Sequence, residues 1–127
     1  MFMSGELLPG LERSEDFEVD AGLLTDVGGT IGGEVLSTPG MIAMMERNAV
    51  KLAYESLPEG KATVGFEVCV KHVGAAVRGA RCTVYARLAE MVDGRKLHFE
   101  VEVREGDRTV GVGTHERRLV DAARFSS

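Results

Sequence analysis

One change of hydrophobic period, near residue 60, constrains the fold of this chain more than any other feature. Before it, apolar side chains recur at helical spacing after Ser37-Thr38-Pro39 and stop at Pro58-Glu59-Gly60. A hydroxyl residue followed by proline is typical of a helix N-cap and first helical position, and proline also ends helices because it has no amide donor. The pattern predicts one helix, capped by Thr38 and ending at about Ser56.

After residue 60, apolar and polar residues alternate, which is typical of half-buried strands. Four such segments follow, at 62–72, 81–91, 96–104 and 108–120, with tight turns at Asp93-Gly94 and Glu105-Gly106-Asp107. Val64, Phe66, Val68 and Val70 are expected to form the buried row of the first. A shorter strand is expected at 16–20, and the glycine-rich stretch 21–36 is expected to be a flexible loop or lid. The fold class is therefore α+β, with an antiparallel sheet of about five strands around one long helix.

Size and charge exclude several classes of protein. The chain has 127 residues, of which 44% are hydrophobic and 28% charged, so we expect one domain over 1–127, with an N-terminal arm at 1–14 and a tail at 121–127. The net charge of −5 and the lack of a basic block make nucleic acid an unfavourable partner, and no apolar run is long enough for a membrane.

The first residues and the cysteines bear on location and chemistry. The start of the chain has no basic and apolar segments of a secretory signal, so we expect a cytoplasmic protein in which Cys69 and Cys82 are thiols that serve packing. The spacing of cysteines and histidines does not match a metal site, and the glycine-rich stretch lacks the Gly-Lys-Ser/Thr of a phosphate loop.

Glu46 breaks the pattern of the helix. Its neighbours three and four positions away are all apolar, whereas Arg47, Lys51 and Glu55 form a solvated row. A carboxylate on an inward stripe needs a partner or resists ionisation, and shielded carboxylates perform general acid/base chemistry. The alternative is a boundary glutamate that reaches solvent or meets an arginine.

Three further residues are candidates for a site. His72 ends an apolar row beside small residues and can reach a pocket, although a core histidine is the commoner case. Thr38 caps a helix whose N-terminus can stabilise an oxyanion. His115 and Arg117 share one face of the last strand, where Arg117 either orients a carboxylate or phosphate or belongs to an ion-pair cluster.

Four segments together resemble the hotdog fold, and more narrowly its fluoroacetyl-CoA thioesterase-like branch, over residues 17–120. They are Ser37-Thr38 with the methionine-rich helix reaching Glu46, Gly65-Phe66-Glu67-Val68-Cys69-Val70-Lys71-His72, Gly94-Arg95-Lys96-Leu97, and Gly113-Thr114-His115-Glu116-Arg117.

This resemblance implies an active site containing Thr38, Glu46 and His72, with Gly65 near the acyl group and Arg117 in a binding role. The family's aromatic lid has no counterpart, because residues 28–36 contain no Phe, Tyr or Trp. Pro39 removes one amide donor at the helix start, so Gly40 is the expected oxyanion donor.

The resulting prediction is an acyl-CoA thioesterase that acts as a homodimer and uses no cofactor, with coenzyme A entering only as part of the substrate. Glu46 is expected to be the base or the nucleophile. The alternatives are a hotdog hydratase or dehydratase, a non-catalytic acyl-CoA-binding module, and a purely structural dimer.

Overall fold

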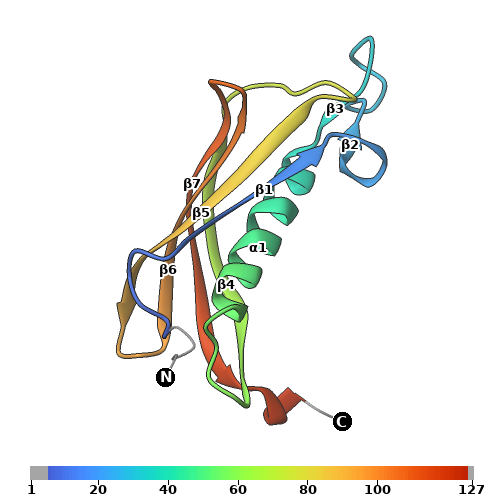
Figure 1. Ribbon diagram of the computed structural model, residues 1–127. Coiled ribbons are helices and arrows are strands. Elements are labelled where there is room, and N and C mark those ends of the chain that lie inside the picture. Colours follow the sequence, from blue (N-terminus) through green and yellow to red (C-terminus); the bar gives the residue numbers. More distant parts are fainter. Residues whose placement is uncertain (1–5, 126–127) are drawn as a thin grey trace.

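The computed structural model describes residues 6–125 and contains one long helix packed against a five-stranded antiparallel sheet (Figure 1). The expected arm and tail lie partly outside the described residues, at 1–5 and 126–127. The sheet has the strand order β1-β5-β6-β7-β4. Its strands are β1 (Glu12–Glu18), β4 (Lys61–His72), β5 (Arg81–Val92), β6 (Lys96–Glu105) and β7 (Arg108–Asp121). The α+β prediction with about five strands is confirmed.

Helix α1 (Thr38–Tyr54) begins one residue earlier than its sequence suggests. Ser37, not Thr38, is the N-cap, because the Gly40 amide donates to Ser37 Oγ at 2.9 Å and the Ser37 backbone is extended. Pro39 lies in the first turn, where its missing N–H has no cost. The expectation for the cap was therefore wrong by one position, and the Thr38 hydroxyl is left for another contact.

The core lies between α1 and the inner face of the sheet. Helix α1 contributes Met41, Met44, Met45, Ala49 and Leu52, and β5 and β6 contribute alternate residues, which include Val84, Leu88, Leu97, Phe99 and Val103. Gly111 of β7 lies directly beneath Met41, where a Cβ atom would collide with the thioether. The methionine side chains of α1 therefore fill the space that the missing Gly111 side chain leaves.

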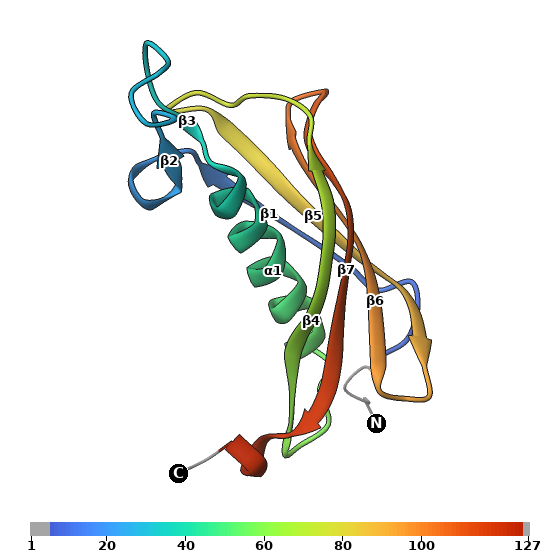
Figure 2. The same ribbon diagram turned by 180° about the vertical axis from the view of Figure 1, so that it is seen from behind.

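Strand β4 forms one edge of the sheet and lies beside α1 (Figure 2). The expectation that its apolar row is buried was wrong for Val64 and Phe66, which are 39% and 59% exposed. The register shifts at Phe66, since Gly65 pairs with Arg117 while Glu67 pairs with Glu116. This β-bulge and the edge position together leave Val64 and Phe66 outside the core, whereas Val70 is half-buried and packs against it.

The glycine-rich stretch is more ordered than a simple loop. It contains the short helix η1 (Ala21–Leu23) and a small hairpin of β2 (Leu24–Thr25) and β3 (Val35–Leu36). Gly28 and Gly29 have positive φ angles in the connecting turn. Leu36 is buried, and its amide donates to the Ala76 carbonyl at 2.7 Å, so the segment that leads into α1 is anchored.

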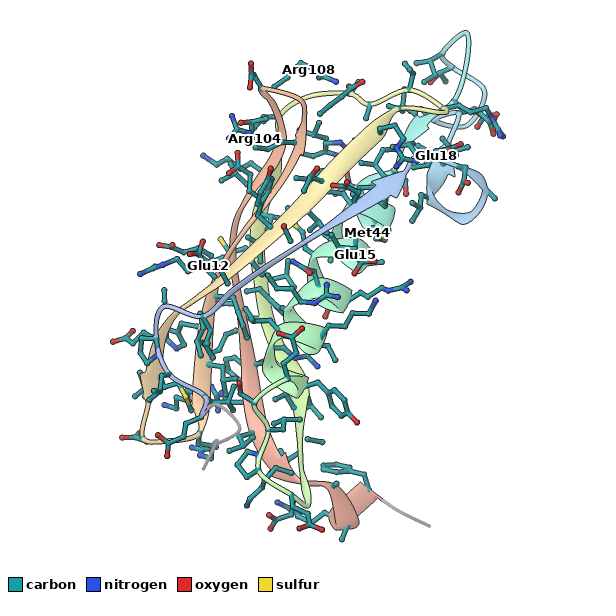
Figure 3. All side chains as sticks on the ribbon, in the orientation of Figure 1. Glu12, Glu15, Glu18, Met44, Arg104 and Arg108 are labelled. Carbon is teal, nitrogen blue, oxygen red and sulfur yellow. The ribbon has the colours of Figure 1, made fainter. Side chains whose placement is uncertain are left out.

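Strand β1 is longer than predicted because it begins at Glu12, inside the expected arm, and pairs with β5. Asn48 of α1 is fully buried and connects the helix to β1. Its Oδ1 accepts from Arg13 Nη1 at 2.6 Å, and its Nδ2 donates to the Arg13 carbonyl at 2.8 Å. Glu15 of β1 adds ion pairs to Arg13 and to Lys51 of the helix (Figure 3). These contacts of Arg13, Glu15, Asn48 and Lys51 form a clamp between β1 and α1.

Within the described residues, no helix is both long and apolar enough to cross a membrane.

Candidate active site

Thr38 and His72 meet at the start of α1. The Thr38 Oγ1 atom lies 2.8 Å from His72 Nδ1. The helix supplies the hydroxyl from its first turn, and β4 supplies the imidazole from its last residue. His72 Nε2 is buried and has no hydrogen-bond partner among the described residues. The pair therefore presents one unused imidazole nitrogen near the positive end of a helix.

Glu46 lies on the flank of α1 that faces β4, two turns beyond Thr38. Its side chain is 41% exposed, so it is not on the inward stripe that its apolar neighbours suggested. The buried side chains of α1 lie on a different side of the helix from Glu46. Val50, which lies one turn after Glu46 on the same flank, is 37% exposed. Its Oε2 atom lies 3.9 Å from Arg117 Nη1, so the carboxylate has a cationic neighbour.

Arg117 is only 7% exposed and is held by several acceptors. Its Nε donates to Thr63 Oγ1 at 2.9 Å, its Nη2 donates to the Thr63 carbonyl at 3.0 Å, and its Nη1 lies 3.2 Å from His115 Nε2. Burial lowers the pKa of Arg117, an effect that the charge of Glu46 opposes. Because arginine ordinarily titrates far above neutral pH, the guanidinium remains a cation.

Gly65 makes room for this ion pair. A Cβ atom at this position would lie 3.2 Å from Glu46 Oε2 and 3.4 Å from Arg117 Nη1. The carboxylate therefore rests over bare backbone. Around it is an opening of about 250 Å³, lined by Glu46, Gly65, Phe66, Glu67, Val68 and His115.

Gly40 has a different role from the expected one. Its amide already donates to Ser37, and an added Cβ would lie 2.9 Å from the Leu23 carbonyl oxygen. Gly40 is buried, and the structure gives its N–H a capping bond in place of a free position for an oxyanion.

The cysteines lie apart from these groups. Cys82 is buried, and burial raises the pKa of its thiol, whereas Cys69 is exposed and does not serve packing as expected. Among residues 6–125, no three His, Cys, Asp or Glu side chains are grouped so that they could hold a metal ion.

Two clusters result, one with Thr38 and His72 and the other with Glu46, Gly65 and Arg117. Thr38 and Glu46 are eight residues apart, which corresponds to about 12 Å along a helix. The sequence did not predict the contact of Thr63 with Arg117, nor the burial of His115. Thr63 gave no signal, because a threonine at a polar strand position is unremarkable.

One long helix packed against a five-stranded antiparallel sheet is the architecture of hotdog-fold thioesterases. The model of the fluoroacetyl-CoA-specific thioesterase family FlK matches residues 19–123. The chain belongs to this family, and it is a thioester hydrolase.

Individual relatives agree. The fluoroacetyl-CoA thioesterase of Streptantibioticus cattleyicolor is 34% identical over 94 residues, which cover 74% of this chain and 67% of that protein. A solved structure of FlK is 28% identical with a TM-score of 0.84, covering 95% of this chain and 93% of that one. A thioesterase superfamily member from Thermus thermophilus is 26% identical with a TM-score of 0.80, covering 98% and 89%.

Proposed function

We propose that this protein hydrolyses the thioester bond of a small or medium acyl-CoA. The observation that carries the proposal is the Glu46 carboxylate, held over Gly65 beside the buried Arg117 guanidinium at an opening to solvent. The family supports it, because the Streptantibioticus relative is a fluoroacetyl-CoA thioesterase and a variant of FlK has been solved with fluoroacetate and CoA.

Glu46 is the reacting carboxylate in this proposal. In one route it removes a proton from water, whose oxygen adds to the thioester carbon. In the other it attacks that carbon itself, forming an anhydride that water then hydrolyses. In both routes the carbon–sulfur bond breaks and the departing thiolate takes up a proton. Mass spectrometry of rapidly quenched enzyme separates the routes, because only the second leaves an acyl group on Glu46.

Thr38 and His72 act on the other side of the thioester. The unpartnered His72 Nε2 can stabilise charge on the substrate or protonate the thiolate, while the bond to Thr38 fixes the ring. The positive end of α1 favours a developing oxyanion nearby. Gly65 and Arg117 are assigned to the acyl side of the site, next to Glu46.

The active form is proposed to be a homodimer that pairs through β4. This edge strand carries exposed Val64 and Phe66, and an unpaired sheet edge is a template for a second strand. A two-fold axis crossing β4 between Gly65 and His72 reverses the second helix. The partner's Glu46 then approaches the Thr38 and His72 pair of the first protomer, which joins two clusters that one protomer keeps apart.

The CoA portion is expected to lie on the surface, with its phosphates near basic residues. Lys71 and Arg81 are exposed, whereas Arg78 already pairs with Glu34 at 2.7 Å. The proposed reaction needs only water and no cofactor. A cytoplasmic location stays a prediction from the sequence.

The test is release of free thiol from short, medium, aromatic and fluorinated acyl-CoAs by wild type and Glu46→Gln. Wild type is expected to release thiol, and the variant to be slower by about 100-fold or more. Crotonyl-CoA tests the hydratase alternative, since hydration consumes it without releasing thiol. The proposal fails if no acyl-CoA yields thiol, or if Glu46→Gln is as fast as wild type.

A further inference from the structure

His115 is 2% exposed and has no part in the reaction described above. Its two ring nitrogens nevertheless have specific neighbours. Nδ1 lies 2.8 Å from the Glu67 carbonyl oxygen, and Nε2 lies 3.2 Å from Arg117 Nη1. A carbonyl only accepts and a guanidinium only donates, so both contacts require the same tautomer. Nδ1 carries the proton and Nε2 is the acceptor.

The bulge in β4 creates this arrangement. Because Phe66 is an extra residue in β4, Val68 pairs with His115. A regular register continued from the Gly65–Arg117 pair would instead place Glu67 opposite His115. Bulges redirect backbone and side-chain groups in this way and are common next to active sites. The Glu67 carbonyl is thereby bound by the imidazole, which fixes the orientation of the ring.

The guanidinium of Arg117 is held by hydrogen bonds to two residues. Thr63 binds Nε and Nη2, and His115 binds Nη1, which is the nitrogen that faces Glu46. Without the imidazole, the Nη1 corner would have only the carboxylate to orient it, at 3.9 Å.

We propose that His115 is a positioning residue, which as a neutral imidazole holds the Arg117 guanidinium so that Nη1 lies beside the reacting carboxylate of Glu46. This rests on the proposed function, in which Glu46 performs the chemistry. His115 acts through Arg117 and touches no substrate atom.

The surroundings of His115 keep it neutral. Burial lowers its pKa, and the positive charge of Arg117 acts in the same direction, while the Glu67 carbonyl and the Glu46 charge oppose them. The Phe99 ring of β6 is also stacked with the imidazole, at a centroid distance of 6.2 Å. A protonated imidazole would lose its acceptor and place a second cation beside the guanidinium.

The first test is spectroscopic and does not depend on activity. The chain has three histidines, so long-range 1H–15N correlation spectra of wild type and His115→Gln assign the His115 ring. We expect a protonated Nδ1 and an unprotonated Nε2 that persist from about pH 6 to 8. A protonated Nε2, or titration of the ring within that range, would overturn the proposal.

The second test compares two variants that each keep one half of the imidazole. Glutamine places an amide oxygen near the former Nε2 and can still accept from Arg117, whereas asparagine can only replace the Nδ1 donor. We expect His115→Asn to lower kcat about 10- to 100-fold with little change in KM, and His115→Gln to retain at least about a third of wild-type kcat. Equal loss in both variants would contradict the assignment.

The shape of the pH profile separates positioning from proton transfer. His115→Gln is expected to keep both the acidic and the basic limb of the wild-type plot of kcat against pH. Loss of either limb would show that His115 transfers a proton instead. Glu100→Gln is the control, because Glu100 lies on the neighbouring strand β6 and its carboxylate bonds to Arg87, outside the proposed site. Circular dichroism confirms that each variant folds.

A double-mutant cycle tests the route of action. If His115 works through Arg117, adding His115→Asn to Arg117→Met changes kcat less than about twofold. An undiminished effect would overturn the proposal. Glu46→Gln separates the two levels: full activity in that variant refutes the proposed function, whereas an inactive Glu46→Gln with fully active His115→Asn refutes only the role of His115.

Discussion

Thr38 Oγ1 lies 2.8 Å from His72 Nδ1, which joins the first residue of helix α1 to the last residue of the edge strand β4. The bond is available because Ser37, and not Thr38, caps the helix. Two adjacent hydroxyl residues therefore have separate tasks, one in the stability of the helix and one at the candidate site.

This separation predicts opposite effects of two neighbouring substitutions. Thr38→Val removes the hydroxyl without altering the cap, so kcat should fall about 100-fold while the free energy of unfolding is nearly unchanged. Ser37→Ala should cost about 1 kcal/mol of stability and leave kcat near wild type. Thiol-release kinetics and urea unfolding measure both, with Thr38→Ser as the control that keeps the hydroxyl. A Thr38→Val enzyme of wild-type activity would remove Thr38 from the site.

The proposed dimer predicts complementation between inactive variants. If each site combines Thr38 and His72 of one protomer with the partner's Glu46, a heterodimer of Glu46→Gln and His72→Ala regains one intact site of two. Random mixing of refolded subunits should then restore about a quarter of wild-type activity. Sites contained within one protomer would give no restoration, and a monomeric mass by light scattering would exclude the dimer.

Gly65→Ala should reduce activity more than stability. Its Cβ would lie 3.2 Å from Glu46 Oε2, so the carboxylate must shift by a few tenths of an ångström away from its present position beside Arg117. A displaced reacting group should lower kcat about tenfold. Steady-state kinetics and thermal melting check this, and a variant with wild-type kcat would show that the carboxylate does not depend on the glycine.

Asn48→Ala should destabilise the fold by about 2 kcal/mol. The substitution removes the buried bonds from Asn48 to Arg13 and leaves the Arg13 carbonyl without its donor. Arg47→Ala is the matched control, because Arg47 is the preceding residue and is exposed, so its replacement should change stability by less than about 0.5 kcal/mol. Equal urea midpoints for the two variants would contradict the role assigned to Asn48.

Glu15→Gln should lower stability in a pH-dependent manner. The hydrogen bond from Arg13 is the largest of the effects that lower the pKa of Glu15, and the bond to Lys51 adds to it. Since the folded-state pKa is below the unfolded one, this stabilisation is present near neutral pH and is lost as the pH falls through the acid range.

The difference in unfolding free energy between wild type and Glu15→Gln should therefore shrink from about pH 5 to about pH 3. Glu12→Gln, on the same strand but at an exposed position, should show a small difference throughout (Figure 3). A Glu15→Gln difference that stays constant with pH would show that the clamp does not depend on the charge.

The elements that sequence predicted well are those with a strong local period. The helix and the four long strands appear within a residue or two of their expected ends, because alternation and helical spacing report which side of an element is apolar. The start of β1 at Glu12 was missed, since its residues are mostly polar and are held by pairing with β5 and by Asn48.

The sequence by itself determined the fold class, the helix that carries Thr38 and Glu46, and the strands that carry Gly65, His72 and Arg117. Only the tertiary structure decided which of these side chains meet. The edge position of β4 and its bulge at Phe66 expose Val64 and Phe66. They also bring together Glu67, His115, Arg117 and Glu46. The physical reason is that the hydrophobic period of a helix or strand is written in residues close together along the chain. Contacts between elements depend instead on strand register and burial.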